Sequence, residues 1–107
     1  MARHSVSRAT VETLQILGAS IRAARLSRGW SVEQLAQRIG VSHPTVTKVE
    51  RGDPGVAIGT AFEAATLLGL ELYSDAETRS RYGAQKRREL ALLPSAARRQ
   101  RVIDDDF

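Results

Sequence analysis

The sequence predicts an all-α protein, and three observations support this. Apolar residues make up 42% of the 107 residues but aromatic residues only 5%, so the core is built mainly from aliphatic side chains and alanine. That composition suits packed helices better than a sheet. Several stretches repeat apolar residues at spacings of three and four, and serine caps and glycine stops lie between them. The length allows one domain with a short appendage, and the pattern predicts five helices.

The N-terminal part is expected to be a flexible basic arm over residues 1–9, followed by a helix over residues 10–28. The arm is polar and has no periodicity, as chain ends commonly are. Gly18 lies inside the helix at a cost of about 1 kcal/mol relative to alanine, and a close helix contact would explain it. Gly29 ends the helix as a left-handed residue. The apolar residues of this helix that recur on one face are Leu14, Leu17, Ile21 and Ala24.

Two consecutive helix-start signals follow in the stretch WSVEQLAQRIGVSHPTVTKVER, residues 30–51. Ser31 is a natural N-cap and Gln34 completes a capping box. Ser42 is the second N-cap, and Pro44 follows in the first turn, where its missing N–H costs no hydrogen bond. Between them, Gly40 supplies the left-handed residue of a tight turn. The two predicted helices run from Val32 to about Ile39 and from His43 to about Arg51.

Two short helices joined by a glycine turn have the geometry of a helix-turn-helix, which lays its second helix in the major groove of DNA. The outward positions of that helix are His43, Pro44, Thr47 and Lys48, and the N-terminal residues of such a helix reach base edges. Lys48 can donate to guanine, Thr47 can hydrogen-bond or offer its methyl to thymine, and His43 can donate or accept. The alternative is an ordinary exposed helix face.

Other residues suit contacts to DNA phosphates, which position a protein without specifying sequence. Ser42, Thr45 and Arg51 flank the base-reading positions. In the arm, Arg3 and Arg8 could also touch DNA, although an arm without a role is the commoner case. The net charge of +4 and pI of about 10.3 lean mildly towards a polyanionic partner, and a solvated surface alone would also account for them.

A fourth helix is expected over about residues 58–68, after the turn sequence RGDPGVA at residues 51–57. Phe62, Ala65 and Leu68 are expected to face the core. The start of this helix has no good capping residue. Together with the preceding helices it completes a predicted DNA-binding domain over residues 10–73.

The remaining residues, 74–107, are expected to form a C-terminal helix and a charged tail. The helix would run from Asp75 to Leu93 with a weak apolar face, closed by Pro94. Residues 79–101 hold eight cations against Glu89 alone, and three aspartates follow, a pattern typical of an interaction tail. The alternative is a solvated end with no role. The candidate partner-binding residues of the tail are Arg98, Arg99, Arg101, Asp104, Asp105, Asp106 and Phe107.

The segment LGASIRAARLSRGWSVEQLAQRIGVSHPTVTKVERG, within residues 17–72, is similar to the Xre/Cro-type repressor family, which has a five-helix phage-repressor-like fold. The resemblance implies that the four outward residues named above occupy base-reading positions. It also implies that Arg25 pairs with Glu50 beside the DNA backbone, where Arg25 would lie near phosphates together with Arg51. Val32 departs from the family, which usually has a glutamine there that touches DNA. Affinity would then rest more on backbone amides and arginines.

A second, shorter resemblance concerns the loop RGDPGVAIGT and the C-terminal LLPSAARRQRVIDDDF, which look like those of HipB-like antitoxins. The resemblance implies a homodimer that binds its own palindromic operator and sequesters a HipA-like serine/threonine kinase toxin. One alternative is a stand-alone Xre-family transcriptional regulator whose tail serves dimerisation only. Another is a protein-interaction module whose helix-turn-helix no longer reads DNA.

Several function classes are not expected. The chain has no cysteine, which excludes a disulfide framework and fits a reducing cytoplasm. No apolar run reaches the ~18 residues of a membrane span, and the N-terminus lacks the apolar region of a signal peptide. Only His4 and His43 are present, and no catalytic set can be assembled. The three consecutive aspartates at 104–106 lack the fixed geometry of a metal site. We therefore expect no enzyme activity, cofactor or metal.

Overall fold

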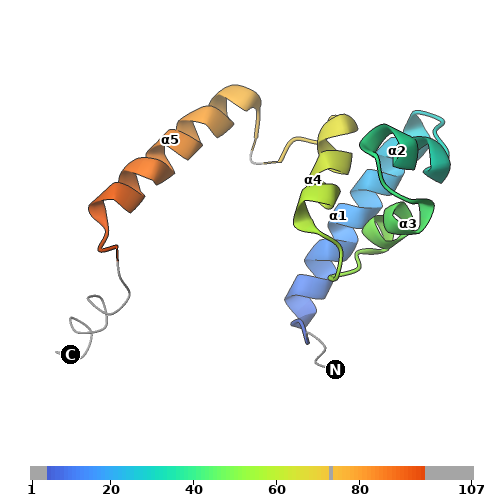
Figure 1. The fold of residues 1–107 in the computed structure, drawn as a ribbon, viewed down its shortest axis with the longest axis horizontal. Helices are drawn as coiled ribbons and strands as arrows, with labels where there is room; N and C mark the ends of the chain where they lie inside the picture. The colour runs from blue at the N-terminus through green and yellow to red at the C-terminus, as the bar shows by residue number, and fades with distance from the viewer. Residues whose placement is uncertain (1–4, 73, 96–107) are drawn as a thin grey trace. The chain divides into compact units, whose positions relative to one another are not determined.

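The computed structural model describes residues 5–72 and 74–95, which form five helices and no strand (Figure 1). The predicted all-α class is therefore confirmed. None of the helices in the described ranges is long and apolar enough to cross a membrane. The helices are α1 (Arg8–Ser27), α2 (Val32–Ile39), α3 (His43–Arg51), α4 (Ile58–Leu67) and α5 (Ala76–Leu92).

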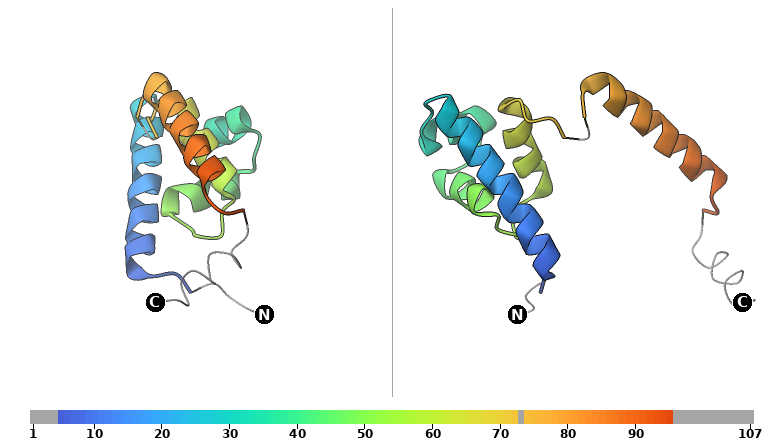
Figure 2. Two further views of the ribbon diagram at one scale, coloured as in Figure 1. Left: turned by 90° about the vertical axis from the view of Figure 1, so that its left-hand side faces the viewer. Right: turned by 180° about the vertical axis from the view of Figure 1, so that it is seen from behind.

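The chain divides into two compact units, residues 1–72 and residues 73–107. The first unit holds α1 to α4 and the hydrophobic core. Ile21, Leu35 and Val46, from three different helices, are fully buried there. In the first unit α3 contacts both α1 and α2, and α2 also contacts α4. Figure 2 shows the N-terminal end of α1 extending beyond its neighbours, in keeping with the exposure of its first turn.

Helix α1 begins at Arg8, two residues earlier than expected, because Ser7 caps it. The Ser7 hydroxyl accepts a hydrogen bond from the Thr10 N–H at 3.2 Å. Arg8 and Ala9, which were expected in the flexible arm, therefore lie in the first turn of the helix. Residues 1–4 of the arm lie outside the described residues.

The glycine that ends α1 forms the predicted Schellman-type stop. The Gly29 N–H donates to the Leu26 carbonyl at 2.9 Å, and the Trp30 N–H donates to the Arg25 carbonyl at 3.2 Å. The same pair of hydrogen bonds closes the next three helices, so one local device ends every helix of the first unit. The residues with positive φ at these later stops are Gly40, Gly52 and Gly69.

A close backbone contact between α1 and the end of α3 explains Gly18, as predicted. A Cβ at Gly18 would lie 2.6 Å from the carbonyl oxygen of Val49 and 2.5 Å from that of Glu50. At Gly52 a Cβ would lie 2.9 Å from the Gln15 backbone. The two glycines therefore let α1 and the C-terminal end of α3 approach more closely than any side chain would allow.

Helix α4 lacks a side-chain cap at Ala57, as its sequence predicted. Ala65 and Leu68 are buried in the core, but the prediction that Phe62 faces the core was wrong, because its side chain is 36% exposed. Phe62 lies four residues after Ile58, so the two share the outer side of the helix, where Ile58 is 71% exposed.

Helix α5 forms where it was predicted, between Asp75 as N-cap and Leu93 as C-cap. The Asp75 carboxylate accepts a hydrogen bond from the Thr78 N–H at 2.8 Å. The helix continues through Gly83 without interruption. It contains no buried residue, in contrast to each helix of the first unit.

Candidate nucleic-acid interface

The orientation of α3 is fixed by its cap and its buried side. The Ser42 hydroxyl accepts a hydrogen bond from the Thr45 N–H at 3.3 Å, and the chain enters the helix from the left-handed Gly40 with φ of 72°. Val46 and Val49 are buried against the core. A helix held in this way presents one defined set of side chains to solvent, which a surface that reads base edges requires.

The four predicted base-reading residues are all exposed and share the side of α3 opposite its buried valines. At about 100° per residue, they span an arc of about 140° that also includes Arg51. The structure thus brings them together on one surface, although their contact with bases stays a prediction. These residues are His43, Pro44, Thr47 and Lys48.

Two residues of this surface differ in what they can offer a ligand. The Thr47 hydroxyl donates to the His43 carbonyl at 3.3 Å, which leaves its methyl group and its oxygen lone pairs free. No carboxylate among the described residues lies within ion-pair distance of Lys48. Its ammonium group is therefore available as an uncompensated donor.

The predicted phosphate-contact residues beside this surface already have partners within the chain. The hydroxyls of Ser42 and Thr45 lie 2.9 Å apart and serve the cap of α3. The Arg51 Nη2 atom lies 3.7 Å from the Asp53 Oδ2 atom, and the Arg51 side chain is 64% exposed. Such an exposed, long ion pair is weak, so Arg51 can exchange it for a phosphate.

Arg25 forms the ion pair with Glu50 that the family resemblance implied. Its Nε donates to Glu50 Oε2 at 2.6 Å, its Nη2 donates to Glu50 Oε1 at 3.0 Å, and its Nη1 donates to the Trp30 carbonyl at 2.8 Å. The hydrogen bonds to Glu50, together with its negative charge, raise the pKa of Arg25 above its ordinary value. A bidentate pair of this kind holds α1, the α1–α2 turn and α3 in one arrangement.

A phosphate contact for Arg25 was also expected, but the structure leaves this side chain little exposed surface for one. Arg25 is only 6% exposed, and its guanidinium group is committed to Glu50 and Trp30. Arg25 is therefore a positioning residue that acts on α3 through Glu50.

Helix α2 supports α3 from the other side of the turn. Its N-terminus carries the predicted capping box, with the Gln34 N–H donating to the Ser31 hydroxyl at 3.1 Å and the Ser31 N–H donating to Gln34 Oε1 at 2.8 Å. Val32 packs against the core. Its apolar side chain cannot make the polar DNA contact that a glutamine would make at this position. The Arg38 guanidinium lies 4.1 Å from the ring centre of Trp30 and adds a cation–π contact.

The remaining predicted contacts lie elsewhere. Arg8 is exposed at the start of α1, where its Nε atom lies 4.0 Å from the Glu12 carboxylate. Arg3 lies outside the described residues. The same holds for the predicted partner-binding residues of the tail, which are Arg98, Arg99, Arg101, Asp104, Asp105, Asp106 and Phe107.

Comparison with known proteins agrees with this geometry. Residues 21–73 match the helix-turn-helix family. The chain carries a helix-turn-helix domain. It is also 33% identical, over 58 residues, to a Neisseria hypothetical transcription factor from Neisseria meningitidis serogroup B. That alignment covers 54% of this chain and 55% of the relative, so the chain spans about half the length of the relative. No solved structure matches the chain at a significant level.

Two features that shape the helix-turn-helix domain were not predicted from its sequence. One is the stop at Gly52, where RGDP was interpreted only as turn chemistry, although a glycine directly after Arg51 is itself a stop signal. The other is the hydrogen bond from Arg25 to the Trp30 carbonyl, for which the sequence carries no local signal.

Proposed function

We propose that this chain is a transcription regulator that binds duplex DNA by placing α3 in the major groove. The observation that carries the proposal is a short helix with its valine side buried and its His43, Thr47 and Lys48 side exposed. The match of residues 21–73 to the helix-turn-helix family and the likeness to a protein named as a transcription factor support it.

In this proposal Lys48, Thr47 and His43 read base edges, with Pro44 packed against the groove, while Ser42, Thr45 and Arg51 contact phosphates. Each chain has one such reading helix, which covers only a short half-site. We therefore propose a homodimer on a palindromic operator with half-sites about 34 Å apart. Occupation of an operator by this dimer would repress transcription.

The direct test is binding of the full chain to DNA from upstream of its own coding sequence. Fluorescence anisotropy would compare a labelled duplex of this DNA with a duplex of the same base composition in scrambled order. We expect the first to bind at least about 10³-fold more tightly at physiological salt. Equal affinity for the two duplexes would contradict sequence-specific regulation.

We also propose that the protein is the antitoxin of a type II toxin–antitoxin pair, in which it silences a HipA-like kinase. The support is the resemblance of the loop RGDPGVAIGT and of the C-terminal sequence to HipB-like antitoxins. Co-expression with the product of the adjacent reading frame tests this. A kinase-sized protein that co-purifies with the chain is the expected result, and a chain that purifies alone would contradict it.

The second candidate is a stand-alone regulator whose C-terminal part serves dimerisation only. It is favoured by the exposed apolar side chains Leu90, Leu92 and Leu93 near the end of α5. A chain ending at Tyr73 separates the two, because the core and its supporting residues all lie within residues 17–72 and this part should fold alone. The antitoxin proposal predicts that this shorter chain stays dimeric by light scattering but loses the kinase. The second candidate predicts a monomer.

A further inference from the structure

Helix α5 lacks the feature that normally fixes a helix in a protein, namely a buried side. None of its 17 residues is buried, although it is capped by Asp75 and helical throughout. Its two exposed leucines, Leu90 and Leu92, do not share one face either. Leu90 and Leu92 are two residues apart and therefore lie about 200° apart around the helix. A protein partner usually needs a central apolar cluster, which α5 does not offer.

What α5 offers instead is positive charge. It carries five cations against the two carboxylates Glu77 and Glu89, which leaves a net charge of +3 on 17 residues. Among the residues that the structure describes, only one of the five cations has a carboxylate partner: Lys86, whose Nζ lies 3.2 Å from Glu89 Oε2. The other four, all exposed, are Arg79, Arg81, Arg87 and Arg88.

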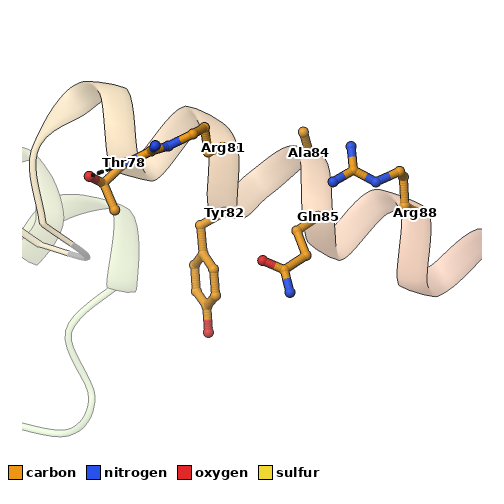
Figure 3. Close-up of a pocket in the computed structure, with 6 residues that line it drawn as sticks. All are labelled: Thr78, Arg81, Tyr82, Ala84, Gln85 and Arg88. Atoms are coloured by element: carbon orange, nitrogen blue, oxygen red, sulfur yellow. Dashed lines mark hydrogen bonds between the residues drawn. The ribbon is translucent and has the colours of Figure 1, made fainter.

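Four of the five cations form two rows along the helix. Arg81 and Arg88 are seven residues apart and therefore share one side of the helix, where they line a shallow hollow with Thr78, Tyr82, Ala84 and Gln85 (Figure 3). Arg79 and Lys86 are also seven residues apart and share a different side. Seven residues rise about 10.5 Å along a helix. That distance equals the rise of about three base pairs along the axis of a DNA duplex, at 3.4 Å each.

We propose that α5 is a second DNA-contact element, which binds the phosphate backbone through its arginines without reading sequence. The proposal rests on the DNA-binding function proposed above and adds a separate surface to it. Phosphate contacts need cations that are exposed and free of carboxylates, and they need no apolar packing, which is the combination found on α5. Within residues 5–72 and 74–95, these four arginines make a single side-chain hydrogen bond, in which Arg81 Nη2 donates to the Thr78 hydroxyl at 3.3 Å.

The test is the salt dependence of duplex binding by the full chain. The probe is a 20-base-pair duplex of random sequence, titrated in fluorescence anisotropy between about 50 and 300 mM NaCl. Each phosphate contact contributes about 0.9 to the slope of log K against log[salt]. The variant Arg81→Gln/Arg88→Gln should therefore have a slope shallower by about 1.8, and its affinity at 0.1 M salt should fall by about 60-fold. Glutamine has nearly the helix propensity of arginine, so α5 should stay folded.

The matched control is Gln85→Ala, which changes the same hollow without removing a charge and should keep the slope of the unmodified chain. An unchanged slope in Arg81→Gln/Arg88→Gln would overturn the proposal. So would unchanged DNA binding combined with loss of a co-purifying protein, because α5 would then be a protein-docking helix. Failure of the unmodified chain to bind any duplex would instead contradict the proposed DNA-binding function itself.

Discussion

Helices α3 and α5 both begin at a capping side chain and both carry exposed cations, but only α3 has a buried side. Ser42 and Asp75 play the same part at the two N-termini, each accepting a hydrogen bond from a backbone N–H three residues on. Val46 and Val49 then bury one side of α3, whereas α5 buries no residue. The caps decide where the two helices begin, and burial decides whether a helix has one orientation.

This difference matters for recognition. Base reading requires donors held at fixed positions relative to a groove, and α3 meets that requirement through its valines and the Arg25–Glu50 ion pair. Phosphate binding requires only charge, which α5 supplies without packing. In this account α3 specifies a DNA sequence and α5 adds affinity.

The largest contrast is between the ion pairs of the two units. Glu50→Ala should destabilise the chain by about 3–5 kcal/mol, because it leaves the buried Arg25 guanidinium without its counter-charge. Glu89→Ala removes the exposed partner of Lys86 and should leave the urea midpoint unchanged. Urea unfolding followed by circular dichroism measures both. Equal midpoints for the two variants would mean that the Arg25–Glu50 pair does not hold the domain together.

Gly18 in α1 and Gly83 in α5 should respond in opposite directions to alanine. Gly18→Ala places a Cβ against two backbone carbonyls of α3 and should destabilise the first unit by about 1–3 kcal/mol in urea unfolding. Gly83→Ala meets only the flexible end of Arg87 at 3.4 Å, so α5 should gain about 1 kcal/mol of helix propensity. Helical 13Cα shifts of α5 measure the gain. A stabilising Gly18→Ala would contradict the close packing of α1 on α3.

Removal of one exposed cation should matter more on α3 than elsewhere. Lys48→Ala should weaken operator binding by about 1–3 kcal/mol and relax specificity at one base position. Arg22→Ala, which removes an exposed cation from α1, should have a smaller effect that does not depend on DNA sequence. Gel shifts on operator and scrambled duplexes measure both. Equal losses for the two variants would argue against base reading by α3.

The caps of the helix-turn-helix should each contribute a smaller, local stabilisation. Ser31→Ala and Ser42→Ala remove hydroxyls that accept backbone N–H groups and should each cost about 1 kcal/mol in urea unfolding. Ser42→Asn keeps an acceptor at the same place and should lose little. A variant Ser42→Ala with the unmodified midpoint would show that packing alone sets the start of α3.

The smallest effect is a pH dependence confined to α5. Hydrogen bonds from the Thr78 N–H and hydroxyl hold the pKa of Asp75 below its ordinary value of 3.8. Because the pKa is lowered on folding, the cap stabilises α5 above that ordinary value and is lost as pH falls through the lowered one. The 13Cα shift of Thr78 should therefore move towards its random-coil value below about pH 4. Asp75→Asn, which caps without titrating, should show no such change.

Local chemistry made most of the helix-turn-helix predictable. Ser31, Gln34, Gly40 and Ser42 act through neighbours within a few residues, so their roles can be inferred from spacing alone. The exposure of Phe62 could not be inferred in this way, because its side of α4 was apolar enough to suggest burial and only the position of the helix decides.

The close approach of α1 to α3 was harder to predict for the same reason. Gly18 predicted a close contact with another helix, but the sequence did not indicate which helix. Gly52 belongs to the same contact only because the fold brings the Gln15 backbone beside it. Arg25 could be assigned to Glu50 only by family resemblance, and its burial, which removes it from the phosphate surface, follows from tertiary packing. Long-range contacts of this kind have no signature within a short window of sequence.

Selection of bound duplexes from a random-sequence pool, followed by sequencing, tests most directly whether α3 reads DNA. The unmodified chain should enrich a two-fold symmetric sequence with half-sites about one helical turn apart. Thr47→Ala/Lys48→Ala should lose preference at defined positions within each half-site. A pool that shows no enrichment with the unmodified chain, or the same motif with both proteins, would contradict the assignment of α3 as the reading helix.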